Sequence, residues 1–332
     1  MHTCRLWLPV FLLISHSLPA FGQTQISDPG AKQICAEVKD VELPAQDRPS
    51  PEEEKALAGC VSQDLYFGFG QPADPVKARK CAYVEMERGN KDLAFGGKSI
   101  LMMVYANGKG ADRDFDVALK LGCEIAGDPA DIAGNVHQLA RLKKAHWTGD
   151  NFSVCAHSSG KYMYEQCAIL QERFDKVERD TKLKGIVATW STQDRMAFES
   201  LQQAASKFFK AHASRESDLE ATHEVQERAF LENEFISTLE RLERGELPVF
   251  SADDLSRADR AMQAALTRIQ TGKVRRWGTV TAEGIKAAQE VWIVYRDAWV
   301  AFGKQKYPGV SADGWKTFLT QERIAMLDFF LH

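Results

Sequence analysis

The chain has 332 residues, of which 44% are hydrophobic, and its 42 basic and 46 acidic side chains give a formal net charge of -4. This mild acidity argues against a nucleic-acid partner, which needs a basic footprint. The length predicts two or three domains, each able to bury an ordinary core.

The first 22 residues are a predicted signal peptide. Arg5 is the only charge before an apolar run at 6–18, which is too short to span a bilayer stably. Small residues at Ala20 and Gly22 suit a signal peptidase. We expect cleavage near Gly22 and a periplasmic product with no stable membrane insertion, and an uncleaved anchor is the alternative.

Helix-start and helix-stop signals follow one another along the chain, with almost no strand alternation. The run Ser50-Pro51-Glu52-Glu53 combines a cap, a first-turn Pro and two acids, and predicts a helix extending towards Tyr66. Further predicted starts are Asp74-Pro75, Asp128-Pro129, Ser191, Ser251 and Ser311, and predicted stops are Gly245, Gly272 and Gly303. The predicted fold class is all-α, with a helical-hairpin, solenoid-like repeat region packed with antiparallel helical modules.

Two segments about forty residues apart share a helix–turn–helix pattern. The clearer copy has an apolar run at 101–106 followed by Gly108, Gly110, Asp114 and Ala118, and the earlier copy has Leu65-Tyr66 followed by Gly68, Gly70, Asp74 and Ala78. The glycines allow the positive φ of a tight turn, and the Asp can cap the second helix. The pattern resembles the Sel-one-like repeat, which implies a scaffold domain over 23–150 that binds proteins or peptides.

Six cysteines remain after signal cleavage, namely Cys35, Cys60, Cys81, Cys123, Cys155 and Cys167. An even number in an exported chain predicts disulfides, and the spacings match no zinc site, so no metal is expected. Fifteen pairings are possible. We predict Cys155–Cys167 because that loop is short, Cys81–Cys123 because both lie on equivalent second helices of the repeats, and Cys35–Cys60 as the remaining pair.

An acidic run extends from Glu216 to Glu243, with nine acids against Arg228 and Arg241, on what we expect to be one long helix. Its ordinary interpretation is a solvated helix face. The alternative is a surface that speeds association with a basic protein, for which Glu224, Glu227 and Glu234 are the candidate binding residues.

The most specific motif is Ala288-Gln289-x-x-Trp292-x-x-Tyr295-Arg296-Asp297-Ala298, followed by Thr320-x-x-Arg323. It closely resembles the pattern of the LprI-type lysozyme inhibitor module, a small helical domain of bacterial envelope proteins. Helical spacing places Gln289, Trp292, Tyr295 and Arg296 on one stripe. The stripe is interpreted either as core, with Arg296, Asp297 and Arg323 bridging helices, or as a ligand contact.

The second half of the chain also repeats itself. Residues 201–212 align with 285–296 at an offset of 84, and Gln226-Glu227-Arg228 is similar to Gln321-Glu322-Arg323. We therefore expect two LprI-like modules, a divergent one over 151–248 and a second over 249–332. The second lacks the family's later cysteines and has Val300 and Trp315 near their positions, so packing there is expected to replace a crosslink.

No catalytic motif stands out. The histidines are scattered, and the sequence has no His-Glu-x-x-His, nucleophile elbow or phosphate loop. We expect no enzyme activity and no cofactor. The resemblance implies an exported envelope protein that binds and inhibits a lysozyme, with lysozyme or another basic envelope protein as partner. The alternatives are a non-inhibitory periplasmic protein-binding scaffold and an enzyme acting on cell-wall material.

Overall fold

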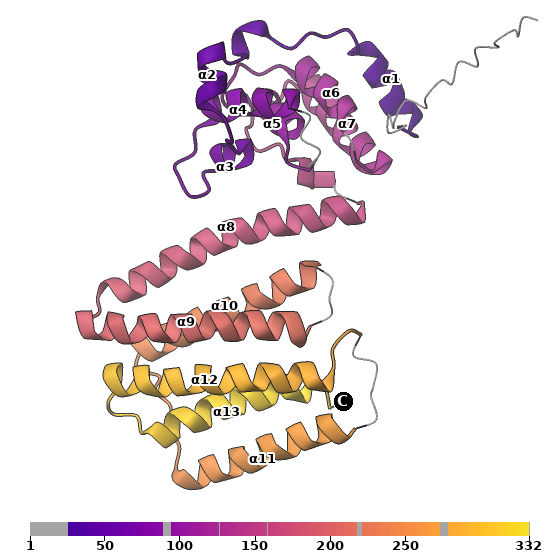
Figure 1. Cartoon of the computed structure of the whole chain (residues 1–332). Coiled ribbons are helices and arrows are strands. Elements are labelled where there is room, and N and C mark those ends of the chain that lie inside the picture. The colour runs from indigo at the N-terminus through magenta and orange to yellow at the C-terminus, as the bar shows by residue number, and fades with distance from the viewer. Residues whose placement is uncertain are drawn as a thin grey trace, which may run out of the picture. The chain divides into compact units, whose positions relative to one another are not determined.

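The structure is a computed structural model that describes residues 26–88, 94–125, 127–157, 159–217, 221–272 and 278–331. These residues form α-helices and two short 3-10 helices with no strand, which confirms the predicted all-α class (Figure 1). They divide into two compact units, Met1–Met163 and Tyr164–His332. The predicted signal peptide lies outside the described residues, and no helix within them is long and apolar enough to cross a membrane.

The first unit is built from short helices. They are α1 (Pro29–Glu37), the 3-10 helix η1 (Ala45–Asp47), α2 (Pro51–Ala56), α3 (Ser62–Phe67), α4 (Pro75–Glu87), α5 (Gly97–Asn107), α6 (Phe115–Glu124), α7 (Pro129–Lys144) and the 3-10 helix η2 (Val154–His157). The helix predicted to run from Pro51 towards Tyr66 is two helices. Its cap is confirmed, because Ser50 and Glu53 form a reciprocal capping box, but α2 ends at Ala56 and the chain turns through Gly59 at φ 75°.

The two predicted hairpins have the same local geometry. Gly68, Gly70, Gly108 and Gly110 all have positive φ, as the turns require. The amide of Asp74 donates to the Leu65 carbonyl (2.8 Å), and the equivalent bond forty residues on runs from Asp114 to Tyr105 (3.0 Å). Asp74 caps α4 and Asp114 caps α6. Pairs α3–α4 and α5–α6 are therefore two copies of one structural repeat.

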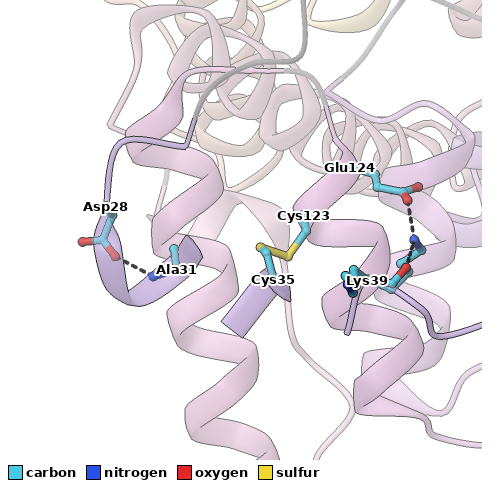
Figure 2. Close-up of a disulfide and its surroundings, with 7 residues drawn as sticks. Asp28, Ala31, Cys35, Lys39, Cys123 and Glu124 are labelled. Atoms are coloured by element: carbon cyan, nitrogen blue, oxygen red, sulfur yellow. Dashed lines mark hydrogen bonds and ion pairs between the residues drawn. A yellow bond between two sulfur atoms is a disulfide. The ribbon is translucent and has the colours of Figure 1, made fainter. Parts of the chain in front are cut away.

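The disulfides of this unit differ from the predicted pairing. The observed bonds are Cys35–Cys123 and Cys60–Cys81, so the predicted Cys35–Cys60 and Cys81–Cys123 bonds are wrong. The main contacts of helix α1 are with helices distant in the sequence. This helix lies against α6 and α7, where Figure 2 shows Cys35 reaching Cys123 on α6, and where His137 of α7 contacts Asp28 at 2.8 Å.

Within the first repeat, Cys60 bonds back to Cys81 of its own hairpin. Cys81 is fully buried in a small cluster with Leu57, Leu65 and Ala78, and Cys60, just before α3, packs against the same cluster, which brings the two sulfur atoms together. Cys155 and Cys167 are disulfide-bonded as well, and nothing contradicts the predicted bond between them.

The second unit consists of longer helices. They are α8 (Lys161–Ala188), which starts just before the unit boundary, α9 (Thr192–Arg215), α10 (Ala221–Glu243), α11 (Ala252–Thr271), α12 (Ala282–Lys306) and α13 (Ala312–Asp328). The predicted caps Ser191, Ser251 and Ser311 all accept a backbone N–H at the start of their helices, which confirms these starts.

Helices α9 and α12 pack together in antiparallel orientation. Gln305 near the end of α12 donates to Asp194 at the start of α9 (3.2 Å). At the other end, a Cβ added to Gly284 of α12 would lie 3.1 Å from the carbonyl oxygen of Arg215. One cluster of buried side chains takes members from α9, α10, α11, α12 and α13. The segments predicted as separate modules over 151–248 and 249–332 therefore share a single core.

Glycine acts as a helix stop at only two of the three predicted positions. Gly245 follows α10 at φ 86° and Gly272 is the C-cap of α11. Gly303 lies inside α12, which continues to Lys306, so its prediction as a stop is wrong. A Cβ at Gly303 would lie 2.3 Å from the indole of Trp315, which is fully buried. Because Gly303 has no side chain, the indole of Trp315 on α13 can pack directly against the backbone of α12.

Candidate functional site

The aromatic residues of the motif at 288–298, Trp292 and Tyr295, and the adjacent Trp299 lie in the core of the second unit. Trp292 is 3% exposed, Tyr295 is 8% exposed and Trp299 is fully buried. The ring of Tyr295 stacks on Phe208 of α9, with centroids 5.2 Å apart. These side chains hold α12 against α9 and present little surface to a partner.

Within the part of the chain that the structure describes, the ion pair of Arg296 and Asp297 joins these two residues to each other and not to another helix, which differs from the core interpretation of the motif. The Arg296 guanidinium contacts Asp297 Oδ1 at 2.9 Å, and both residues belong to α12. Arg296 also lies over the ring of Trp292, 5.4 Å from the centroid. Its side chain covers the motif tryptophan at the surface of the unit.

Arg323 does bridge helices, through a buried polar network. From α13 it donates to Gln289 Oε1 of α12 (2.9 Å) and to Glu216 Oε2 at the end of α9 (2.7 Å). His212 Nδ1 lies 2.6 Å from the same Glu216 oxygen. The side chains of Arg323 and Glu216 are 0% exposed. Burial alone would raise the pKa of Glu216. The contacts of this carboxylate with Arg323 and His212 outweigh burial, so the pKa of Glu216 is lower than its usual value.

The acidic run is not one helix, contrary to expectation. Glu216 ends α9 and is buried in the network just described, while α10 starts at Ala221. Glu232 is paired, because Arg228 and Arg179 each contact it at 2.9 Å. The run therefore divides into acids that hold the fold together and acids that face solvent.

The three candidate binding acids remain at the surface of α10. Glu234 is exposed, and Glu224 and Glu227 are partly exposed. Among the described residues, none of the three has an ion-pair partner. At 100° per residue they fall within about 80° of one another around the helix axis. Their charges are thus uncompensated and point to one side of α10.

A narrow cleft opens beside Glu234, between helices that Figure 1 labels α9, α10, α12 and α13. Its walls are aromatic, from Phe208, Phe209, Phe235, Trp292, Tyr295 and Trp299, and its polar lining includes Glu234, Thr238, Glu322 and Arg323. The cavity measures about 30 Å³, room for about one water molecule.

Glu322 at this cleft is the carboxyl group that sequence reasoning missed. Burial raises its pKa to about 7, Arg241 opposes the rise and Glu234 adds to it. Arg241 lies 4.0 Å away, and the Glu322 side chain keeps 41% of its surface exposed. The sequence carried no sign of this, because Glu322 sits between two residues of the motif without belonging to it.

In comparisons with known proteins, no family model matches this chain, and neither a curated protein nor a solved structure matches it.

Proposed function

We propose that this chain is an exported cell-envelope protein that binds a lysozyme, through the acidic side of α10, and inhibits it. The observation that carries the proposal is the set of carboxylates on Glu224, Glu227 and Glu234, which share one side of α10 and have no ion-pair partner among the residues that the structure describes. Lysozymes are commonly basic, so these charges complement such a partner.

Two further features support the proposal. All six cysteines after residue 22 are disulfide-bonded, which is typical of proteins that fold in an oxidising compartment such as the periplasm. The residues of the lysozyme-inhibitor-like motif build the core beneath this surface, so the motif supports the fold that carries the acids. Like-signed charges on one helix face raise association rates with an oppositely charged protein.

The test combines binding and inhibition. The mature protein is added to a c-type lysozyme in a turbidity assay on bacterial cell walls, and binding is measured in parallel by a pull-down. Inhibition together with capture is the expected result. Capture without inhibition would favour the non-inhibitory scaffold, and turnover of cell-wall material by the protein alone would favour an enzyme.

Charge reversal locates the binding surface. Changing Glu224, Glu227 and Glu234 to Lys is expected to slow association at least tenfold at low salt, where the Debye length is about 30 Å at 0.01 M, and much less at 0.15 M. The matched control reverses Glu199, Asp259 and Glu290, three exposed acids on other helices of the same unit. Equal slowing by both variants would show a net-charge effect and contradict an α10 surface.

A further inference from the structure

An exposed phenylalanine lies among the acids of α10. Phe230 is 56% exposed, whereas Leu231 and Phe235 of the same helix are buried in the core. Glu227 precedes Phe230 by three residues and Glu234 follows it by four, spacings that make side chains neighbours on a helix surface. At 100° per residue, both acids fall within about 60° of Phe230 around the helix axis. An aromatic ring therefore lies between two carboxylates on one side of α10.

No cation of the described residues serves this group. Neither Glu227 nor Glu234 has an ion-pair partner among them, and no Lys or Arg lies over the Phe230 ring. Arg228, which follows Glu227 in the sequence, contacts Glu232 at 2.9 Å instead. The ring is thus exposed to solvent beside negative charge that this unit does not neutralise.

Elsewhere in the second unit, an arginine joins an aromatic ring to a carboxylate. Arg323 lies over the ring of Phe208, 5.6 Å from its centroid, and donates to Glu216 (2.7 Å). The ring and the carboxylate belong to α9, and the guanidinium comes from α13. Arg296 likewise lies over a ring at 5.4 Å and contacts a carboxylate at 2.9 Å. On α10 the ring and the carboxylates have the same chemistry, and they face solvent.

The chemistry of this surface selects among the side chains of a partner. A guanidinium is planar and weakly hydrated, so it can stack on a ring while its N–H groups donate to a carboxylate. A lysine ammonium is a compact, strongly hydrated charge, which pairs with the acids but gains less from the ring. An apolar side chain would cover the ring and would take water from the carboxylates without pairing them. Arginine is the side chain that satisfies both kinds of group.

We propose that Phe230, Glu227 and Glu234 bind an arginine side chain of a basic partner protein. The guanidinium stacks on the Phe230 ring and donates to one of the two carboxylates. This site rests on the proposed function, because it belongs to the same acidic side of α10. It goes further by naming the group that this side recognises and by adding an aromatic contact to the acids.

The experiment uses two short peptides of equal charge, so that it does not depend on lysozyme. One glycine-rich peptide carries two arginines, and the other carries two lysines at the same positions. Each is titrated into the oxidised mature protein at low salt, and binding is followed by the amide shifts of α10. The arginine peptide is expected to bind about threefold more tightly, the effect of one exposed cation–π contact. Equal affinities would overturn the proposal.

Alanine variants locate the preference on the molecule. Phe230→Ala is expected to remove the advantage of the arginine peptide and to leave the melting temperature nearly unchanged, since the ring is exposed. The matched control is Phe329→Ala, which removes a ring that is 79% exposed and has no acid three or four positions before it. An advantage that survives Phe230→Ala, or that both variants lose, would overturn the proposal.

The carboxylates are tested by Glu227→Gln combined with Glu234→Gln, which keeps the side-chain shape and removes the charge. Both peptides are expected to bind at least threefold more weakly to this variant. Unchanged binding of the arginine peptide would overturn pairing with these acids.

Lysozyme binding by the same variants separates this site from the proposed function. If the arginine peptide is preferred and lysozyme does not bind, the arginine site stands and lysozyme is overturned as the partner. If lysozyme binds equally to the wild type and to Phe230→Ala, and the two peptides bind alike, the arginine site is overturned and the lysozyme proposal stands.

Discussion

Removing Arg323 should be among the most destabilising single changes in the second unit. Arg323→Met keeps most of the side-chain volume but leaves Glu216, which is 0% exposed, without its guanidinium partner. Breaking a buried ion pair from one side costs about 3–5 kcal/mol, because a charge stays in the core uncompensated. His212 still contacts Glu216 at 2.6 Å, so we expect the lower end of that range, a fall of roughly 6–12 °C in Tm for a unit of this size.

The loss should depend on pH with a defined sign. In the wild type the pKa of Glu216 is lowered by the fold, so the pair contributes stability above the unfolded value near 4.5 and loses it as the pH falls. In Arg323→Met, burial without the guanidinium raises that pKa, and acid then neutralises the unpaired charge. The gap between wild type and variant is therefore expected to be largest at pH 7, to shrink as the pH falls through the raised pKa of Glu216 in the variant, and to shrink further below 4.5 as the wild type loses its own pair.

The measurement is urea unfolding followed by the fluorescence of Trp292, Trp299 and Trp315, which lie in the affected core. The double variant Arg323→Met with Glu216→Gln is the control, since removing both charges should cost less than the sum of the single changes. A cost below about 1 kcal/mol for Arg323→Met at pH 7, or a gap that widens in acid, would refute the reasoning.

Three further outcomes are expected. Glu322→Gln should raise Tm above pH 7 and leave it unchanged below about pH 4.5, because the folded protein holds a proton on Glu322 up to pH 7 that the unfolded chain releases near 4.5; a gain confined to acid would contradict this. Removing Cys35–Cys123 should cost about 4.6 kcal/mol and removing Cys60–Cys81 about 3.3, since the closed segments span 88 and 21 residues; denaturant unfolding of both double-Ala variants gives the order. Trp292→Ala should cost about 3–5 kcal/mol in the same unfolding assay, and its lysozyme binding should be lost only in proportion to the unfolded fraction.

Helix caps and turn glycines were well predicted from the sequence because their determinants are local. A cap such as Ser191 or Asp114 acts on amides two or three residues away, and a turn glycine such as Gly108 acts through its own φ. The repeat could be recognised in the sequence because the turns of both hairpins need glycines with positive φ at equivalent positions. These features need no knowledge of where distant segments lie.

Features that depend on distant segments were not predicted. The pairing of Cys35 with Cys123 follows from the packing of α1 on α6 and α7, which no local signal encodes. Gly303 looks like a helix stop until Trp315 is known to lie against it. Glu216 looks like one acid in a surface run until Arg323, 107 residues away, is seen beside it.

In the second unit, the motif and the proposed binding surface are made of different residues. Trp292, Tyr295 and Arg323 are the most distinctive residues of the sequence and lie in the core. A substitution there would remove packing or leave a buried charge unpaired. Glu224, Glu227 and Glu234 have no distinctive spacing and lie at the surface, where an exchange costs little stability. A resemblance that rests on the first group therefore informs mainly about the fold. The partner has to be inferred from the charge and exposure of the second group.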